Sequence, residues 1–571
     1  MTFSQDKKWW WLVIIAAVIL INFAASLIHQ RIDLTDEKRF TISSPVKKIL
    51  KDLNEPVEVS VFLKGDLPAG FKKLSTSAQE LLQEFNEYSN GKIHYKVISA
   101  DEKIPGTERT YADTLSSLGI VPINLKVQLE SGEQSQYIFP AALVSYQNKL
   151  QPINLYPGTK TIITPPELNS AEALLEYQFA NGIYKVMGNN RPMIAYAIGN
   201  GEPTGVETYD LVENVLKKNY SLFTVNLATE PVIPDTFKML MIVKPTLQFT
   251  DEEKLKIDQY VMRGGKLLCF VDRLEAEMDS LQIKNQVVAY DRNLRLEDLF
   301  FRYGVRINPD LLMDLQCDFL PFTVNATNNP ASQGKDQFEF LHWNYFPLFE
   351  SKQNSVINKN VGLVAGKFVN SIDTVSAPGV TKTILLNSSD NARTLETPAL
   401  ISGEENRNAP VDAAYNKKNI PAAVLLEGKF SSLYKNRIGK DVMDSLAFYG
   451  TPFLPENIKD NKIIIIADGD IVLNGLYKDQ PLPMGVNFYT VGTQYEYQFA
   501  NKQFVENCIE YLINESGLIE AKAKDYQLNL LDPKKINEEK TMWQMINIAV
   551  PVILVVIFGV IYQWYRRRKF A

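Results

Sequence analysis

Two glycines one residue apart follow an apolar run in "MIAYAIGNGEPTG", Met193 to Gly205. A strand that ends in G-x-G-x-x-G is typical of a dinucleotide-binding turn, whose glycines let the backbone approach a pyrophosphate. Here the third glycine comes one residue too late, Pro203 stands where a helix should begin, and no acid ends the next strand. The pattern favours a tight strand-to-helix turn at the carboxyl edge of a sheet, which is still the edge where a ligand would bind.

Acidic residues follow two further apolar strands, in "KLLCFVD" and "KIIIIADGD". Carboxylates at strand ends can bind a cation, although they more often cap a loop or the next helix. The candidate ligand edge of the sheet comprises Gly199, Gly201, Glu202, Asp272, Asp468 and Asp470. The sequence nevertheless predicts no metal, no cofactor and no catalytic residue.

Two other motifs fail as catalytic signatures. "GDLPAGFK", Gly65 to Lys72, resembles a P-loop, but Phe71 separates its glycine from its lysine and no Ser or Thr follows. Cys269 lies inside an apolar strand with no glycine after it, so the chain lacks a nucleophile elbow. We therefore expect neither an ATPase nor an enzyme of the hydrolase or amidotransferase type.

The composition is that of a folded protein: 571 residues, 45% hydrophobic and 22% charged, with a net charge of −6. Charges of both signs are mixed along the chain, which argues against a nucleic-acid partner. The cysteines form no C-x-x-C pair and are expected to be buried as small hydrophobes, although a disulfide between two of them stays open. They are Cys269, Cys317 and Cys508, and the histidines His29, His94 and His342 are equally scattered.

Both ends of the chain carry long apolar segments. Residues 9–28, "WWWLVIIAAVILINFAASLI", and residues 545–562, "MINIAVPVILVVIFGVIY", are each long enough to cross a bilayer as a helix. Tryptophans and tyrosines flank them where aromatic belts belong. The alternative for the first segment is a cleavable signal peptide, but its apolar part exceeds the usual length.

The flanking cations predict the orientation. Lys7 and Lys8 precede the first span, and the run Arg566–Lys569 follows the second. The positive-inside rule then places both termini in the cytoplasm and the main domain on the periplasmic side of a bacterial inner membrane, in contact with lipid.

Between the spans, period-2 and period-3.6 patterns predict an α/β protein. The first part reads as a small α/β unit in a βαβ order followed by strands, resembling a thioredoxin-like arrangement without redox cysteines. The second alternates apolar strands with helices, which predicts a parallel sheet covered on both faces. Thr250 with Glu253 forms a capping box, and Gly264 ends that helix.

The expected organisation follows from these elements. In chain order it is a cytoplasmic tail at 1–8, a transmembrane helix at 9–28, the small α/β domain at 29–165, a helical connector at 166–190, the larger α/β domain at 191–514 with a loop-rich insertion at about 276–420, a linker at 515–541, a second transmembrane helix at 542–564 and a basic cytoplasmic tail at 565–571.

The order of these segments resembles a known family. The stretches are "FTISSPVKKILKDLNEPVEVSVFL", "AYAIGNGEP", "PDTFKMLMIVKPTLQFTDEEKLKIDQYVMRGGKLLCFVD", "IIIIADGDIVLN" and "NKQFVENCIEYL", between the two spans. They resemble the gliding-motility-associated ABC transporter auxiliary proteins of Bacteroidetes, often labelled substrate-binding, over nearly the whole chain. The resemblance implies a partner ABC ATPase, a multi-span permease and a glutamine-amidotransferase-like sheet without catalytic residues.

The leading expectation is thus a non-catalytic auxiliary subunit of an ABC transporter. A membrane-anchored scaffold for envelope or motility proteins is the first alternative. An enzyme acting on envelope material, using the candidate ligand edge, is the second.

Overall fold

The computed structural model describes residues 41–570 together with residues 15, 16 and 18–20. The gaps in the first range are 121, 130–131, 148, 157–164, 189–190, 279–280, 282–285, 325–336, 352–354, 360, 403–411, 515–516 and 524–532. The chain divides into two compact units, residues 1–525 and 526–571, each of which is described by itself.

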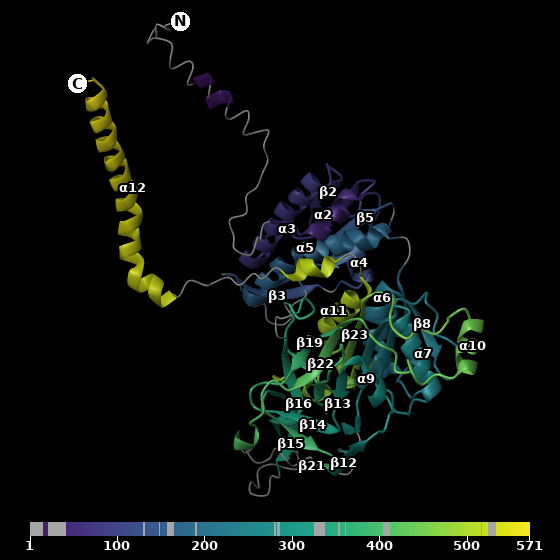
Figure 1. The fold of residues 1–571 in the computed structure, drawn as a ribbon. Coiled ribbons are helices and arrows are strands. Elements are labelled where there is room, and N and C mark those ends of the chain that lie inside the picture. Colours follow the sequence, from purple (N-terminus) through teal and green to yellow (C-terminus); the bar gives the residue numbers. More distant parts are fainter. Residues whose placement is uncertain are drawn as a thin grey trace. The chain divides into compact units, whose positions relative to one another are not determined.

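The N-terminal region of the first unit, hereafter the small region, is an α/β layer (Figure 1). Its four-stranded sheet has the order β2-β1-β5-β6, with β1 and β2 parallel and the other neighbours antiparallel. This confirms the predicted βαβ unit followed by strands. Its elements are α2 (Ser44–Lys51), β1 (Val57–Val61), α3 (Ala69–Tyr88), β2 (Ile93–Val97), α4 (Tyr111–Ser117), β3 (Ile123–Leu129), β4 (Gly132–Ile138), β5 (Ala141–Tyr146), β6 (Lys149–Asn154) and α5 (Pro165–Met187).

The larger region is built on a ten-stranded sheet with the main order β15-β16-β19-β22-β23-β10-β9-β7-β8. Only β8, β7, β9, β10 and β23 run parallel, whereas β22, β19 and β16 pair antiparallel. The predicted all-parallel sheet is therefore wrong for half of its width. Its strands are β7 (Met193–Ile198), β8 (Ser221–Asn226), β9 (Met239–Val243), β10 (Lys266–Phe270), β15 (Cys317–Val324), β16 (Gln337–Ser351), β17 (Val364–Ala365), β19 (Val380–Asn387), β22 (Pro421–Gly428) and β23 (Asn461–Ile466).

Helices cover the parallel half of the sheet on both faces, as predicted. Alternate residues of β7 enter different cores: Ile194 and Tyr196 pack with one set of helices, Ala195 and Ala197 with the other. The period of two follows from strand geometry, and it explains why these strands are apolar throughout. The first set is η2 (Asp210–Leu216) and α11 (Asn501–Ile513), and the second is α7 (Asp251–Met262) and α9 (Glu297–Tyr303).

The capping of α7 is as predicted. Thr250 accepts a hydrogen bond from the backbone of Glu253, and the Glu253 carboxylate accepts one from the backbone of Thr250. Gly264 follows the helix in the left-handed region, with φ +101°. These contacts fix the point at which the loop after β9 becomes helix.

The helix predicted after β7 is not a regular α-helix. It consists of a 3₁₀ turn, η1 (Val206–Thr208), the π-helix η2 and a short α-helical end, α6 (Lys217–Asn219). Within it Asp210 accepts hydrogen bonds from Lys502 Nζ at 3.0 Å and from the backbone of Met484 at 2.8 Å. These contacts come from distant parts of the chain, so the local apolar period does not reveal them. They lie where the helix is wound more widely than an α-helix.

The stretch 276–420 is not the loop-rich insertion that the sequence predicts, because β16 and β19 extend the main sheet through it. A separate aromatic core that includes Trp343, Tyr345 and Phe346 fills this part. Its further strands are β11 (Leu274–Glu275), β12 (Gln286–Asp291), β13 (Val305–Ile307), β14 (Asp310–Asp314), β18 (Ile372–Thr374), β20 (Ala392–Glu396) and β21 (Ala399–Ser402). Beyond it lie α10 (Lys440–Phe448), η5 (Asp470–Val472), β24 (Leu476–Tyr477), β25 (Gln480–Pro481) and η6 (Phe488–Thr490).

A buried polar joint connects the small region to the large sheet. Tyr177 of α5 donates a hydrogen bond to Glu510 of α11. Lys522, in η7 (Leu518–Ala523), lies 3.7 Å from Glu510 and 4.0 Å from the centre of the Tyr177 ring. Burial raises the pKa of Glu510 and lowers that of Lys522, so each group depends on the other for its charge.

The second unit is the helix α12 (Pro533–Phe570). Within it Met542–Arg568, 27 residues that contain an 18-residue window with a mean hydropathy of 2.6, is long and apolar enough to cross a membrane, and no other helix among the described residues is. The predicted linker 515–541 is wrong at both ends, since η7 and the first turns of α12 lie inside it. Most of the expected first span, 9–28, lies outside the described residues.

Candidate functional site

The central parallel strands β9, β10 and β23 end at one edge of the sheet. Val243, Phe270 and Ile466 lie in register across the three strands. Lys244 directly follows β9, Asp272 follows β10 after one residue, and Asp468 follows β23 after one residue. The prediction that these strand-end acids share one edge is confirmed.

Three carboxylates meet there, and a lysine lies among them; we call Lys244, Asp272, Asp468, Asp470 and Glu277 the lysine cluster. Oxygens of Asp272, Asp468 and Asp470 all lie within 4.8 Å of one another. Lys244 Nζ is 2.8 Å from Asp470, 3.2 Å from Glu277 and 3.4 Å from Asp272.

Backbone N–H groups hold the carboxylates in place. Asp468 accepts from the backbone of Lys367 at 2.9 Å and from that of Asp470 at 2.7 Å, and Asp272 accepts from that of Gly469. A Cβ on Gly469 would lie 2.6 Å from Lys244 Cγ, so only glycine fits between the lysine and the carboxylates.

The electrostatics of the lysine cluster follow from burial and from neighbouring charges. Burial disfavours the ammonium of Lys244, but the carboxylates of Asp470, Asp272 and Glu277 outweigh this and raise its pKa. Burial also disfavours the charged form of Asp470. The positive charges nearby, of which Lys244 contributes most, outweigh burial and lower the pKa of Asp470. Burial raises the pKa of Asp272 to about 6 against the pull of Lys244, and with the nearby acids it raises the pKa of Asp468 further.

A lysine competes with a metal ion for this cluster. Three carboxylates resemble a site for a hard cation, but the Lys244 ammonium already lies 2.8 Å from Asp470 and 3.4 Å from Asp272. Arg292 pairs with Glu277 at 2.6 Å, so this acid contacts two cations. Asp468 forms no ion pair among the described residues and is held by backbone N–H groups.

The turn after β7 holds the other predicted residues. Gly199 (φ +118°) and Gly201 (φ +79°) are in the left-handed region that favours glycine. A Cβ on Gly201 would lie 2.0 Å from Thr246 Oγ1, so this turn packs directly on the loop between β9 and α7. The backbone N–H of Asn200 donates to Glu202 at 2.8 Å. The chain's own carboxylate therefore accepts from a turn N–H that would face a phosphate in a nucleotide-binding turn.

The other predicted motifs have structural roles. Cys269 lies within β10 and is fully buried, which raises the pKa of its thiol. All three cysteines are free and buried, as small hydrophobes would be. In the near P-loop, a Cβ on Gly70 would lie 2.3 Å from a methyl carbon of Leu168, so that glycine serves the contact between α3 and α5.

Sequence reasoning missed the residues that complete the edge. They are Lys244, Glu277 and Arg292 in the lysine cluster, and Asn200 and Glu253 at the β7 turn. Lys244 has a signal in the sequence, since it ends the apolar run "KMLMIVK" one position before the place of the acids after the neighbouring strands. Glu277 and Arg292 have none, because the intervening chain must fold back to bring them there.

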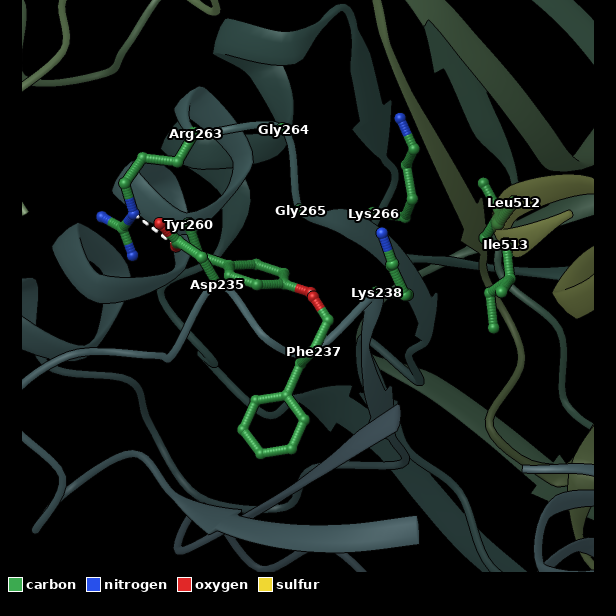
Figure 2. A pocket seen from close by; sticks show the side chains of 10 residues that line it. All are labelled: Asp235, Phe237, Lys238, Tyr260, Arg263, Gly264, Gly265, Lys266, Leu512 and Ile513. Carbon is green, nitrogen blue, oxygen red and sulfur yellow. Dashed lines mark hydrogen bonds and ion pairs between the residues drawn. The ribbon is translucent and has the colours of Figure 1, made fainter. Parts of the chain in front are cut away.

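A cavity of about 180 Å³ lies at the opposite, amino end of β9 and β10 (Figure 2). Lys238 and Lys266 lie near its middle, with Leu512 and Ile513 on one side and Arg263 turned to Asp235 on the other. It is smaller than typical ligand pockets of about 300–1,000 Å³, and none of the predicted site residues lines it. We therefore place the candidate site at the carboxyl edge.

Comparison with known proteins gives two family matches. A family model described as an ABC-type uncharacterized transport system matches residues 191–508, more than half of the chain and the whole of the candidate edge. A domain of unknown function matches residues 36–145 in the small region.

An uncharacterized protein of Borreliella burgdorferi is 21% identical over 555 residues, which is 94% of each chain. Among solved structures, the mmIFT52 N-terminal domain matches over 56% of this chain and 97% of its own length. The identity is 12% and the TM-score is 0.30.

Proposed function

The chain belongs to the auxiliary family of ABC-type uncharacterized transport systems, and on that premise we propose that it is a non-catalytic subunit of an ABC transporter complex. The observation that carries this is the family match over residues 191–508. An auxiliary component of such a system needs partners that hydrolyse ATP and form the membrane path. We propose an ABC ATPase and a multi-span permease in these roles.

The closed carboxyl edge of the sheet supports the non-catalytic part of the proposal. Enzymes with open parallel sheets place reacting groups at this edge, in a crevice that the substrate can enter. Here Lys244, Asp272 and Asp468 are buried, and Lys244 forms ion pairs with Asp272 and Asp470. Cys269, inside β10, is fully buried. The edge has the features of a structural core.

The membrane part of the proposal rests on α12. Its apolar segment Met542–Arg568 ends in the arginines 566–568. Positive charges after a span favour the cytoplasm, so we propose that the large region lies outside the inner membrane, anchored by α12 and by the apolar residues 9–28. The association with gliding motility is part of the proposal through the sequence resemblance.

The test is purification of the full-length protein from its native membranes in mild detergent, with mass spectrometry of what is retained. We expect an ABC ATPase and a multi-span permease in a fixed ratio, absent from a parallel purification of an unrelated membrane-anchored protein. Recovery of envelope proteins without any ATPase would refute the transporter role and favour a scaffold.

A further inference from the structure

Asn200, in the turn after β7, has one polar atom that receives no hydrogen bond. The residue is 2% exposed. Its carbonyl accepts from the backbone of Thr246 at 2.9 Å and of Leu247 at 2.8 Å, and its backbone N–H donates to Glu202. Its Nδ2 donates to the Gln248 carbonyl and to Glu253, both at 3.2 Å. Only Oδ1 remains, buried and with no donor among the described residues.

The orientation of this amide is fixed by its neighbours. Exchanging Nδ2 and Oδ1 would place an oxygen against the Gln248 carbonyl and the Glu253 carboxylate, which are both acceptors. The orphaned atom is therefore an oxygen, which can be satisfied only by a donor or a cation.

A second orphaned oxygen lies two residues away. Glu202 is 8% exposed, and its Oε1 is buried with no hydrogen-bond partner in the described part of the chain. Its other oxygen accepts from the backbone of Asn200. Glu253 adds another carboxylate, 5% exposed, which contacts Asn200 Nδ2. Within the described ranges neither glutamate forms an ion pair, and buried carboxylates without a partner are costly.

The lysines nearest in sequence are committed elsewhere. Lys244 lies in the lysine cluster, and Lys254 pairs with Asp298 at 2.8 Å and with Asp251 at 3.0 Å. Neither of these lysines therefore pairs with this second group of acids.

We propose that Asn200 Oδ1 and Glu202 Oε1 bind a hard divalent cation, with Glu253 supplying the second negative charge. Carboxylate and amide oxygens are the ligands that Ca²⁺ and Mg²⁺ take in proteins. Ca²⁺ fits better, because it accepts irregular sets of protein oxygens, whereas Mg²⁺ keeps several waters in a strict octahedron. We call Asn200, Glu202 and Glu253 the cation turn.

The bound cation would link three segments. It connects the turn after β7 to the first turn of α7 through Glu253, beside the contacts of Asn200 with the loop after β9. Its role would be to lock these loops at the carboxyl edge, next to the lysine cluster.

The experiment uses the full-length protein in detergent, freed of metal by a chelator. Calorimetric titration with CaCl₂ and MgCl₂, and thermal unfolding with each salt against NaCl at equal ionic strength, measure the response. We expect saturable Ca²⁺ binding, weaker Mg²⁺ binding, and a Tm that rises more with Ca²⁺ than with Mg²⁺ and not with NaCl. Glu202→Gln should weaken Ca²⁺ binding by more than the roughly 10–100-fold that changing a group behind a ligand produces.

Two control variants locate the effect. Glu207→Gln, in η1 just after the turn and outside the three residues of the proposed site, should bind Ca²⁺ as the wild type does. Asp470→Asn, in the lysine cluster, should also keep the Ca²⁺ response. Should Glu202→Gln fail to fold, Glu253→Gln and the wild-type titration replace it. If the wild type binds no Ca²⁺, the proposal is overturned. A proton on Glu202 then accounts for its buried carboxyl group. Binding kept in Glu202→Gln and lost in Asp470→Asn would overturn it as well.

Discussion

The lysine cluster and the cation turn both place buried acids at the ends of neighbouring strands, but their charges are balanced differently. In the cluster, the ammonium of Lys244 lies within 3.4 Å of three carboxylates. In the turn, Glu202 and Glu253 have no ion-pair partner among the described residues, and two oxygens have no donor. A charge balanced by the chain itself is permanent, whereas one balanced from solution depends on conditions. One edge of a sheet can thus combine a fixed element with a responsive one.

The largest expected effect comes from removing the lysine of the cluster. Lys244→Met leaves buried carboxylates without their counter-charge, which should lower the free energy of unfolding by about 3–5 kcal/mol. Urea unfolding of the full-length protein in detergent measures it. Adding Asp470→Asn to this variant should restore part of the loss. A loss below about 1 kcal/mol in the single variant would contradict the fixed role of the cluster.

The next effect tests how tightly the turn after β7 packs on the loop between β9 and α7. Gly201→Ala introduces a Cβ 2.0 Å from Thr246 Oγ1 at a φ of +79°, and should cost about 2–3 kcal/mol. Gly450→Ala is the matched control, because Gly450 has a φ of +75° and nothing within 4 Å of the added carbon. The control should cost only about 1 kcal/mol. Equal losses in the two variants would show that the loops are not in contact.

A smaller effect, the pH dependence of the free energy of unfolding, distinguishes the lysine cluster from the cation turn. The pKa of Asp272 is about 6 in the folded chain against about 3.9 in the unfolded one, so the folded state holds this proton more tightly. The stabilisation from this proton is complete below about pH 4, falls as the pH rises to about 6, and is constant above. The wild type should therefore lose on the order of 2 kcal/mol relative to Asp272→Asn across this window.

Unfolding at a series of pH values measures this difference. Asp470, whose pKa is lowered by Lys244, is present in both proteins, so its opposite dependence largely cancels. Burial raises the pKa of Glu202 as well, with the same sign of pH dependence. Added Ca²⁺ should remove the Glu202 part and leave the Asp272 part unchanged. If Ca²⁺ changed the Asp272 part as well, the lysine cluster and the cation turn would not be independent.

The smallest effect is expected from Glu207→Gln. Glu207 Oε1 accepts a hydrogen bond from the backbone of Gly205 at 3.0 Å, on the solvent side of the turn. The amide oxygen of glutamine can accept the same bond, so the free energy of unfolding should change by less than about 0.5 kcal/mol. A larger loss would show that charge anywhere in the turn matters, and would weaken the distinction between Glu202 and its neighbours.

The sequence predicts the parallel half of the large sheet well. Its strands are short, apolar and separated by helices, and the capping box of Thr250 and Glu253 marks one helix start. The antiparallel half was missed although β16 pairs with β15 and β19, which lie close to it along the chain. Pro347 within β16 and the many polar residues around it favour a loop when only local patterns are read.

The residues of the candidate edge likewise divide into those that the sequence predicts and those that it does not. Asp272, Asp468 and Asp470 were predicted because each follows an apolar strand, and strand ends meet by topology alone. Lys244 was missed because a lysine after a strand normally faces solvent. Asn200 was missed because its importance lies in a hydrogen bond that is absent, and no sequence pattern records a missing donor. Glu253 was read only as part of a capping box, because its contact with Asn200 joins residues far apart in the chain.

The core of the small region is completed from the far end of the chain. Leu518 and Ala521, in η7, are fully buried among the residues that α2, α3 and α5 contribute. During synthesis the helix α5 emerges roughly 15–65 s before these residues, at the usual rates of translation. Until then the nascent small region has an unfilled core, and a prematurely terminated chain keeps it open to proteases and chaperones. The small region therefore completes its core only after the chain has been made as far as η7.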